Sequence, residues 1–209
     1  MEILSFKEAK DILLKYKMPF CETEIFDSLS KGLSYAEEIG FPVALKAYGK
    51  NVFHRTEQGG VAINIKTREE FRREWNNIYD NFKDIEGVLI QKMIKGKELI
   101  LGMNRNEQFG PVLMFGLGGI YTELYKDIAL RIAPVSKKEA LEIIKETKAY
   151  EIVKGFRGEG VNEEKLIDLI LKLSNLSIKE EAIQSIDFNP VMGNKEEVLI
   201  VDFKIVVWI

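Results

Sequence analysis

Cysteine and histidine are nearly missing from these 209 residues: Cys21 is the only cysteine and His54 the only histidine. A single cysteine excludes an internal disulfide framework and a cysteine-rich zinc site. We also find no apolar run long enough to span a bilayer and no signal-peptide pattern at the start. These absences predict a cytoplasmic protein with no membrane association.

A large excess of charge of one sign is missing as well. The chain has 30 Lys and Arg residues against 33 Asp and Glu residues, which gives a net charge of −3. This balance argues against a dedicated nucleic-acid binder, because such proteins usually carry a basic excess. Hydrophobic residues make up 46% of the chain, enough for a real core in one large domain or two small lobes.

The spacing of apolar residues switches repeatedly between the helical and the strand period, which predicts an α+β (α/β) fold without internal repeats. Ser5 and Glu8 form a capping-box pattern before the first predicted helix. Ser136 and Asn162 are the predicted N-caps of two later helices. The first half reads as a β-α-β-loop-β-α lobe that ends in a strand at 88–93.

The second half predicts a hairpin with strands at 98–103 and 112–115 and a turn at 104–106. A strand at 128–133 follows, and two late strands are predicted at 183–192 and 198–207. The whole pattern predicts two α+β lobes with a cleft between them.

Two cationic or nucleophilic side chains occupy unusual places. Lys46 lies inside an apolar strand, where it either directs its charge at nucleotide phosphates or reaches solvent at an edge strand. His54 lies in a polar loop beside Lys50 and Arg55, where imidazole is a good nucleophile for phosphorus. Taken alone, each residue favours the simpler interpretation, an edge lysine and an exposed histidine.

Three oxygen-bearing side chains gather near the C-terminus. Asp187 and Asn189 alternate on one face of a strand, and a turn brings Asp202 back beside them. Carboxylate and carbonyl oxygens suit Mg²⁺, which also takes phosphate oxygens. A hairpin with a solvated acidic face explains the same pattern equally well.

Glycines at 116, 118 and 119 form a short cluster, but the chain has no Walker A sequence. A tight turn explains this cluster. The alternative, a phosphate-binding loop, would need Glu123 and Arg131 nearby.

Taken together, the segments resemble the ATP-grasp subunit of ADP-forming acyl-CoA synthetases such as archaeal acetyl-CoA synthetase. The resemblance runs in order along nearly the whole chain. The matching segments are FPVALK (41–46), HRTEQGGV (54–61), FGPVLMFGLGG (109–119), KDIALRIAP (126–134), DFNP (187–190) and VDFKI (201–205).

The resemblance implies an ATP-grasp fold in which two lobes grip the nucleotide. It implies a smaller lobe at 22–94 with a mobile loop that carries His54, and a larger lobe of 1–21 plus 95–209. Its implied site residues are Lys46 for the ATP phosphates; Gln91, Lys92 and Met93 with nearby Glu98 for the adenine; Arg131 as a catalytic cation; Asp187, Asn189 and Asp202 for Mg²⁺; and His54 as a transiently phosphorylated residue.

The resemblance also implies the reaction, which interconverts acyl-CoA, ADP and phosphate with the acid, CoA and ATP. It implies a CoA-binding partner subunit that bears its own phosphohistidine, so the chain alone is expected to be inactive. Two alternatives remain open. The first is another ATP-grasp carboxylate ligase, either succinyl-CoA synthetase-like or joining an acid to an amine. The second is a non-catalytic, ATP-sensing subunit.

Overall fold

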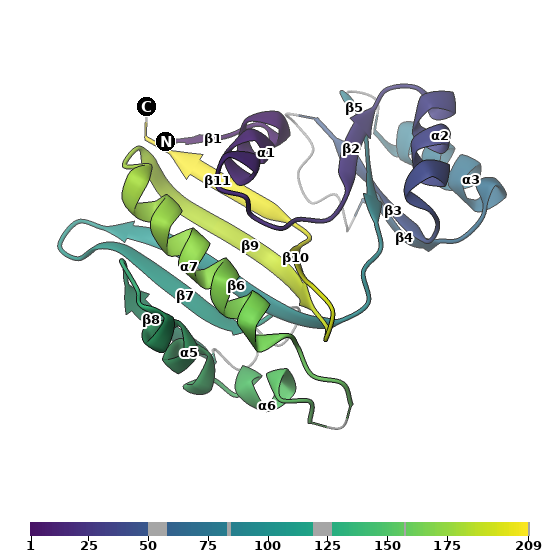
Figure 1. The fold of residues 1–209 in the computed structure, drawn as a ribbon. Helices are drawn as coiled ribbons and strands as arrows, with labels where there is room; N and C mark the ends of the chain where they lie inside the picture. The colour runs from purple at the N-terminus through teal and green to yellow at the C-terminus, as the bar shows by residue number, and fades with distance from the viewer. Residues whose placement is uncertain (50–57, 83–84, 119–126, 157, 209) are drawn as a thin grey trace. The chain divides into compact units, whose positions relative to one another are not determined.

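The computed structural model describes residues 1–49, 58–82, 85–118, 127–156 and 158–208 (Figure 1). The chain divides into two compact units. The smaller unit is Cys21–Ile94, and the larger unit combines Met1–Phe20 with Lys95–Ile209. In the part of the chain that the structure describes, no helix has the length and apolarity needed to cross a membrane.

The smaller unit is an antiparallel sheet with strand order β2-β5-β3-β4 and two helices on one face. Its elements are β2 (Thr23–Phe26), α2 (Leu29–Ile39), β3 (Val43–Tyr48), β4 (Val61–Ile65), α3 (Arg68–Asn81) and β5 (Gly87–Lys92).

Helix α3 illustrates why this local sequence folds as it does. The Thr67 side chain accepts a hydrogen bond from the Glu70 N–H at 3.1 Å and so caps the first turn. Phe71, Trp75 and Ile78 recur at helical spacing and are buried against the sheet. The apolar stripe therefore fixes which side of α3 packs on the strands.

Helix α2 packs closely on the same face because it presents a glycine there. A Cβ atom on Gly32 would lie 2.8 Å from side-chain atoms of both Ile90 and Trp75. Such a distance is too short for carbon atoms in contact. The missing side chain thus lets α2 approach β5 and α3.

The larger unit is a seven-stranded antiparallel sheet with strand order β1-β11-β9-β6-β7-β8, in which β10 also pairs with β9. Strands β1 and β11 pair, so the two chain ends lie side by side (Figure 1). Its elements are β1 (Glu2–Ile3), α1 (Phe6–Lys15), β6 (Lys97–Asn106), β7 (Gly110–Leu117), β8 (Ile128–Ile132), α5 (Lys137–Lys145), α6 (Ala149–Val153), α7 (Glu163–Lys179), β9 (Ile183–Gly193), β10 (Val198–Ile200) and β11 (Phe203–Val207).

The described helices of the larger unit share one hydrophobic core with one face of this sheet. Helix α7 lies across β6 and β7 (Figure 1). Arg105 of β6 holds the end of α7, because its guanidinium donates to the carbonyls of Ser177 at 2.7 Å and Glu180 at 3.1 Å. These carbonyls belong to the group that a helix leaves unpaired at its C-terminus.

The predicted fold class is confirmed, and so are the capping residues Ser5, Ser136 and Asn162. The turn predicted at 104–106 is wrong: β6 continues to Asn106 and β7 begins at Gly110. The reason is local, since the Asn106 side chain accepts from the N–H groups of residues 108 and 109 and closes the turn there.

The strand predicted at 198–207 is also interrupted. It forms β10 and β11, and the break falls at Val201 and Asp202. Helix α6 was not predicted, because a helix of five residues gives too little periodicity to stand out in the sequence.

Candidate functional site

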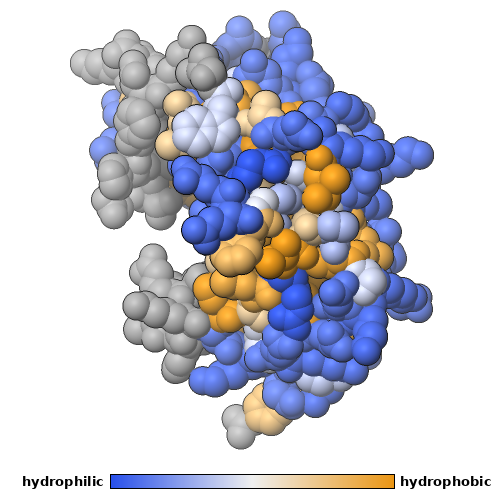
Figure 2. Space-filling model, turned by 90° about the vertical axis from the view of Figure 1, so that its left-hand side faces the viewer, coloured by the Kyte–Doolittle hydropathy of each residue, from blue (hydrophilic) through white to orange (hydrophobic). Residues whose placement is uncertain are grey.

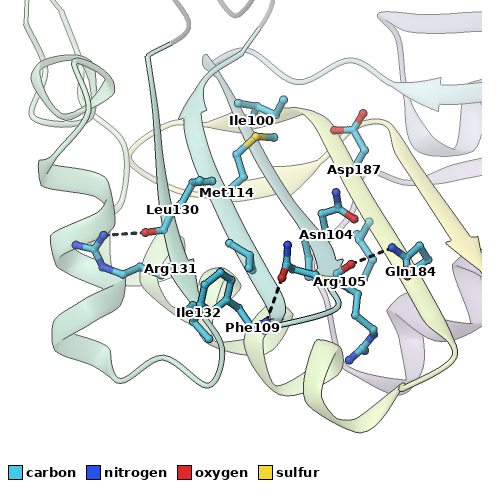
Figure 3. A pocket seen from close by; sticks show the side chains of 14 residues that line it. Ile100, Asn104, Arg105, Phe109, Met114, Leu130, Arg131, Ile132, Gln184 and Asp187 are labelled. Carbon is cyan, nitrogen blue, oxygen red and sulfur yellow. Dashed lines mark hydrogen bonds between the residues drawn. The ribbon is translucent and has the colours of Figure 1, made fainter.

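Side chains of the large sheet alternate between a helix-covered face and the opposite face, which we call the helix-free face because none of the described helices packs on it. Strand pairing aligns one row across this second face: Leu130, Met114, Gly102, Asp187 and Lys204. Asp187 thus shares a face with Leu130 and Met114, as Figure 3 shows. This row puts a carboxylate at the border of an apolar surface.

The three residues predicted to bind Mg²⁺ come together on β9 and at the junction of β10 and β11. The Asn189 N–H donates to the Asp202 carbonyl at 3.2 Å. One carboxylate oxygen of Asp202 accepts from the Phe203 N–H at 3.0 Å. Asp187 lies two residues before Asn189 and pairs with Lys204 of β11. The break between β10 and β11 therefore places Asp202 beside β9.

Two features of the structure raise the cost of ionising Asp187. Partial burial raises the pKa of Asp187 above its ordinary value, and the negative charge of Asp202 raises this pKa further. Lys204 lowers the same pKa, but the two opposing causes outweigh it. An acidic pair held together at such a cost is typical of a site that receives a cation.

The donor set fits Mg²⁺ only together with a ligand that brings more oxygens. Among the described residues, no three His, Cys, Asp or Glu side chains converge as a metal site. Two carboxylates and one amide remain at Asp187, Asn189 and Asp202. Mg²⁺ commonly takes one or two carboxylates plus phosphate oxygens and water. These residues could therefore hold a Mg²⁺ ion that arrives with a nucleotide.

Arg131 lies on the other side of the sheet. Its strand partner is Leu113, which belongs to the core beneath the helices. The guanidinium forms an ion pair with Glu146 at the end of α5 and donates to the Leu130 carbonyl at 2.8 Å. Figure 3 shows this hydrogen bond to the Leu130 carbonyl, with the Arg131 side chain pointing away from Asp187. Arg131 and Asp187 both line one hollow of the larger unit, but the Arg131 side chain is paired with Glu146, and its catalytic role stays a prediction.

Glu98 comes from β6, four residues before Gly102. Even-numbered residues of this part of β6 alternate with the buried Leu99 and Leu101, so Glu98 lies on the helix-free side. It is exposed. This is the same face of the sheet that carries Asp187.

In the smaller unit, Lys46 and Gln91 lie on the face opposite the helices. The neighbours of Lys46 on β3, Leu45 and Ala47, are fully buried beneath α2 and α3, so Lys46 points the other way. Gln91 is buried, and its amide donates to the Thr23 hydroxyl at 2.9 Å. Both predicted residues therefore belong to the helix-free face of the small sheet.

Backbone hydrogen bonds hold the predicted adenine hinge in a way that the sequence did not indicate. The N–H of Lys92 donates to the Glu22 carbonyl at 3.0 Å, and that of Met93 donates to the Pro42 carbonyl at 3.1 Å. The first N–H after β5 without a partner among the described residues is that of Ile94. The sequence did not point to Ile94, because it does not show which backbone N–H groups form hydrogen bonds with neighbouring segments.

The Lys92 side chain turns toward the helices. Lys92 pairs with the fully buried Val43, and its ammonium donates to the carbonyls of Ile39 and Gly40 at the end of α2. It does not join Lys46 and Gln91 on the opposite face. His54, the predicted phosphorylated residue, lies outside the described residues.

The helix-free face of the larger unit is hollowed. The hollow measures about 780 Å³ and is lined by apolar residues of β6, β7 and β8, by Asp187, and by further polar residues (Figure 3). These further polar residues are Asn104, Arg105, Asn106, Arg131 and Gln184. Its mouth carries Phe109 at the hairpin turn and Leu130 and Ile132 on β8. A volume of this size accepts a ligand or an inserted segment of protein.

Comparison with known proteins identifies the family. The ATP-grasp domain model matches residues 1–207. The chain belongs to the ATP-grasp family. It is 41% identical to the β subunit of ADP-forming acetate–CoA ligase I of Pyrococcus furiosus, over 95% of this chain and 89% of that protein. It is also 38% identical to ADP-forming acetate–CoA ligase I of Archaeoglobus fulgidus, over 95% of this chain but only 30% of that longer protein.

Solved structures of the family agree with the fold. An acetyl-coenzyme A synthetase of Ca. Korarchaeum cryptofilum, in complex with coenzyme A and Ca-AMPCP, matches with a TM-score of 0.93 and 36% identity. The match covers 99% of this chain and 94% of that one. A second structure of the same enzyme holds Mg-AMPPCP, with a phosphohistidine segment that points towards the nucleotide-binding site. The predicted ATP-grasp fold and the predicted resemblance are both confirmed.

The raised pKa of Asp187 gives a stability prediction. Asp187→Asn should stabilise the nucleotide-free protein at pH 7, because the amide removes an ionised group that the folded state disfavours. Below the unfolded-state pKa of about 3.9, Asp187 is protonated in both states and the gain should vanish. The gain should grow as the pH rises through the folded-state pKa. Urea unfolding at several pH values measures it.

Glu107→Gln in the exposed β6–β7 turn is the control for a general charge effect. If Asp187→Asn were no more stable than the wild type at pH 7, or if its gain were equally large at pH 3, the proposed repulsion would be contradicted.

Proposed function

We propose that this chain is the nucleotide-binding subunit of an ADP-forming acid–CoA ligase. The observation that carries the proposal is the convergence of Asp187, Asn189 and Asp202 on the helix-free face of an ATP-grasp chain. The support from relatives is the near full-length match to β subunits of ADP-forming acetate–CoA ligases.

We assign separate tasks to the two units. In the smaller unit, Lys46 contacts the phosphates, and the hinge at Gln91–Ile94 receives the adenine. In the larger unit, Asp187, Asn189 and Asp202 hold a Mg²⁺ ion, which supplies charge neutralisation on the nucleotide. Glu98 lies close to the hinge in sequence and is assigned to the same nucleotide. The units then correspond to the two ATP-grasp lobes expected from the sequence.

We further propose that His54 relays the phosphoryl group. Nitrogen of the imidazole attacks the phosphorus of a phosphohistidine on the partner, and the partner's N–P bond breaks as the new N–P bond forms. A β-phosphate oxygen of ADP then attacks the same phosphorus, which releases neutral imidazole and forms ATP. Lys46 stabilises the charge on the transferring group. A relay serves best where the acyl and nucleotide sites are too distant for direct transfer.

The partner in this proposal is a CoA-binding subunit with its own phosphohistidine. The Archaeoglobus relative, whose name designates a whole acetate–CoA ligase, is more than three times as long as the part matched here. The two Pyrococcus relatives are named β subunits and are covered to 89% of their length, and on this ground we assign the CoA-dependent half of the reaction to a partner subunit.

We assign the docking of this partner to the apolar part of the helix-free face. Ile128, Leu130 and Ile132 on β8 are 43%, 53% and 51% exposed, and Phe109 is 58% exposed. Hydrophobic side chains gather on the side of the molecule where β8 and the β6–β7 hairpin lie (Figure 2). Among the described strands, β8 is an edge of the sheet, and an exposed apolar edge strand invites association with another chain. This surface adjoins Asp187 in the same hollow, where a phosphohistidine must deliver its group.

The metal assignment predicts the behaviour of Asp202→Asn. The substitution keeps the shape but removes one anionic ligand, so the Kd for Mg·ADP should rise about tenfold, while the fold remains stable. Isothermal titration of the purified chain over a range of Mg²⁺ concentrations measures this. The control is Asp168→Asn, which removes an exposed carboxylate of α7. An unchanged Mg²⁺ dependence would instead support a solvated acidic hairpin.

The relay predicts the behaviour of His54→Asn, which removes the nucleophile and keeps much of the size. The variant complex should bind ADP and permit acyl phosphate formation, yet fail to make ATP. Mass spectrometry after incubation with Mg·ATP should find acid-labile phosphate on the wild-type chain and none on the variant. Near-normal ATP synthesis by the variant would favour direct transfer. ATP binding without ADP/ATP exchange in the wild-type complex would favour an ATP-sensing subunit.

The docking surface predicts the behaviour of Leu130→Lys. A charged side chain in the centre of the apolar face should weaken assembly with the CoA-binding subunit at least tenfold, because the ammonium would be desolvated there. Mg·ADP binding by the chain alone should stay unchanged. Sedimentation of the mixed subunits measures the assembly. Ile178→Lys, on the solvent side of α7 at 41% exposure, is the matched control and should assemble normally.

A further inference from the structure

Helix α2 ends without a cation of its own. Its last turn contains no basic residue but does contain Glu37 and Glu38. The last carbonyls of a helix lack partners within the helix and carry a partial negative charge. Arg68 of α3 forms an ion pair with the Glu37 carboxylate, but α2 itself supplies no cation for its last carbonyls. A positive group placed at these carbonyls from elsewhere in the unit is therefore stabilising.

Lys92 supplies that group from the neighbouring strand. Its ammonium donates to the carbonyl of Ile39 at 2.6 Å and to that of Gly40 at 2.5 Å. Gly40 has φ 77°, in the left-handed region that favours glycine. A Cβ on Gly40 would lie 3.1 Å from the Lys92 Nζ, so the glycine also leaves room for the ammonium.

The same residue is held through its backbone. The Lys92 N–H donates to Glu22, and the next N–H, that of Met93, donates to Pro42. The hinge at the end of β5 is thus tied to the residue before β2, to the segment before β3 and to the end of α2. Ile94 follows with an N–H that has no partner among the described residues, and this group can meet a ligand.

We propose that Lys92 is a positioning residue for the nucleotide. It anchors the hinge to the C-terminus of α2 and so fixes the direction in which the backbone at Ile94 faces the adenine. Its ammonium does not contact the base. The inference rests on the proposed function, since the hinge has this task only if the chain binds a nucleotide.

The closing experiment compares ADP with 7-deaza-ADP, which lacks the N7 acceptor that a lysine would contact. Lys92→Met should weaken binding of both nucleotides by the same factor, about tenfold, because the loss comes from a displaced hinge. Lys92→Arg should recover most of the affinity, since a guanidinium can also donate to two carbonyls. Lys31→Met, which removes an exposed cation from the same helix, should bind both nucleotides as the wild type does.

Hydrogen exchange of the nucleotide-free chain adds a readout that does not need the ligand. Faster exchange at the Lys92 and Met93 amides in Lys92→Met, with restoration in Lys92→Arg, supports the anchor. Lys92→Met with normal nucleotide affinity but lower thermal stability would overturn the proposal and leave Lys92 with a structural role alone. The proposal would also be overturned if the wild type bound 7-deaza-ADP more weakly than ADP while Lys92→Met bound the two nucleotides equally. That result would show a direct contact between the Lys92 ammonium and N7 of the base.

Failure of the proposed function would look different. If the wild-type chain bound neither ADP nor 7-deaza-ADP, the proposed function and this inference would both fall. If it bound ADP normally and only the Lys92 variants departed from expectation, the inference alone would fall.

Discussion

Successive side chains of a strand point to opposite faces of its sheet, and this alternation organises both units. One face of each sheet packs against helices, and this contact buries the apolar residues that hold the unit together. The other face is then free of that packing requirement and can carry charged groups. Lys46 in the small sheet and Asp187 in the large sheet both lie on such faces, one residue away from fully buried neighbours.

The charged groups on the large sheet come at a cost to the folded state. Asp187 and Asp202 repel each other, and Lys204 offsets this only in part. A protein selected for stability alone would gain by replacing one carboxylate, whereas a bound cation converts the same repulsion into affinity. This repulsion supports the proposed Mg²⁺ site at Asp187, Asn189 and Asp202.

Three basic side chains contact helix ends, and two of them, Lys92 and Arg131, are also predicted nucleotide-site residues. Arg105 binds carbonyls at the end of α7, Lys92 binds those at the end of α2, and Arg131 pairs with Glu146 at the end of α5. Helix ends need such partners because their last carbonyls have none within the helix. A basic residue on a strand can therefore contact either a helix end or a ligand on the opposite face. The face of the sheet on which its side chain lies decides which of the two it contacts.

The sequence by itself determined the fold class, the family, the helix caps at Ser5, Ser136 and Asn162, and the gathering of Asp187, Asn189 and Asp202. These depend on local spacing and on motifs a few residues long. Only the tertiary structure decided that Arg131 and Lys92 face the helices and that the Ile94 N–H has no partner among the described residues. The face that a strand turns toward its helices and the partners of each N–H depend on pairing between distant segments, which local patterns do not encode.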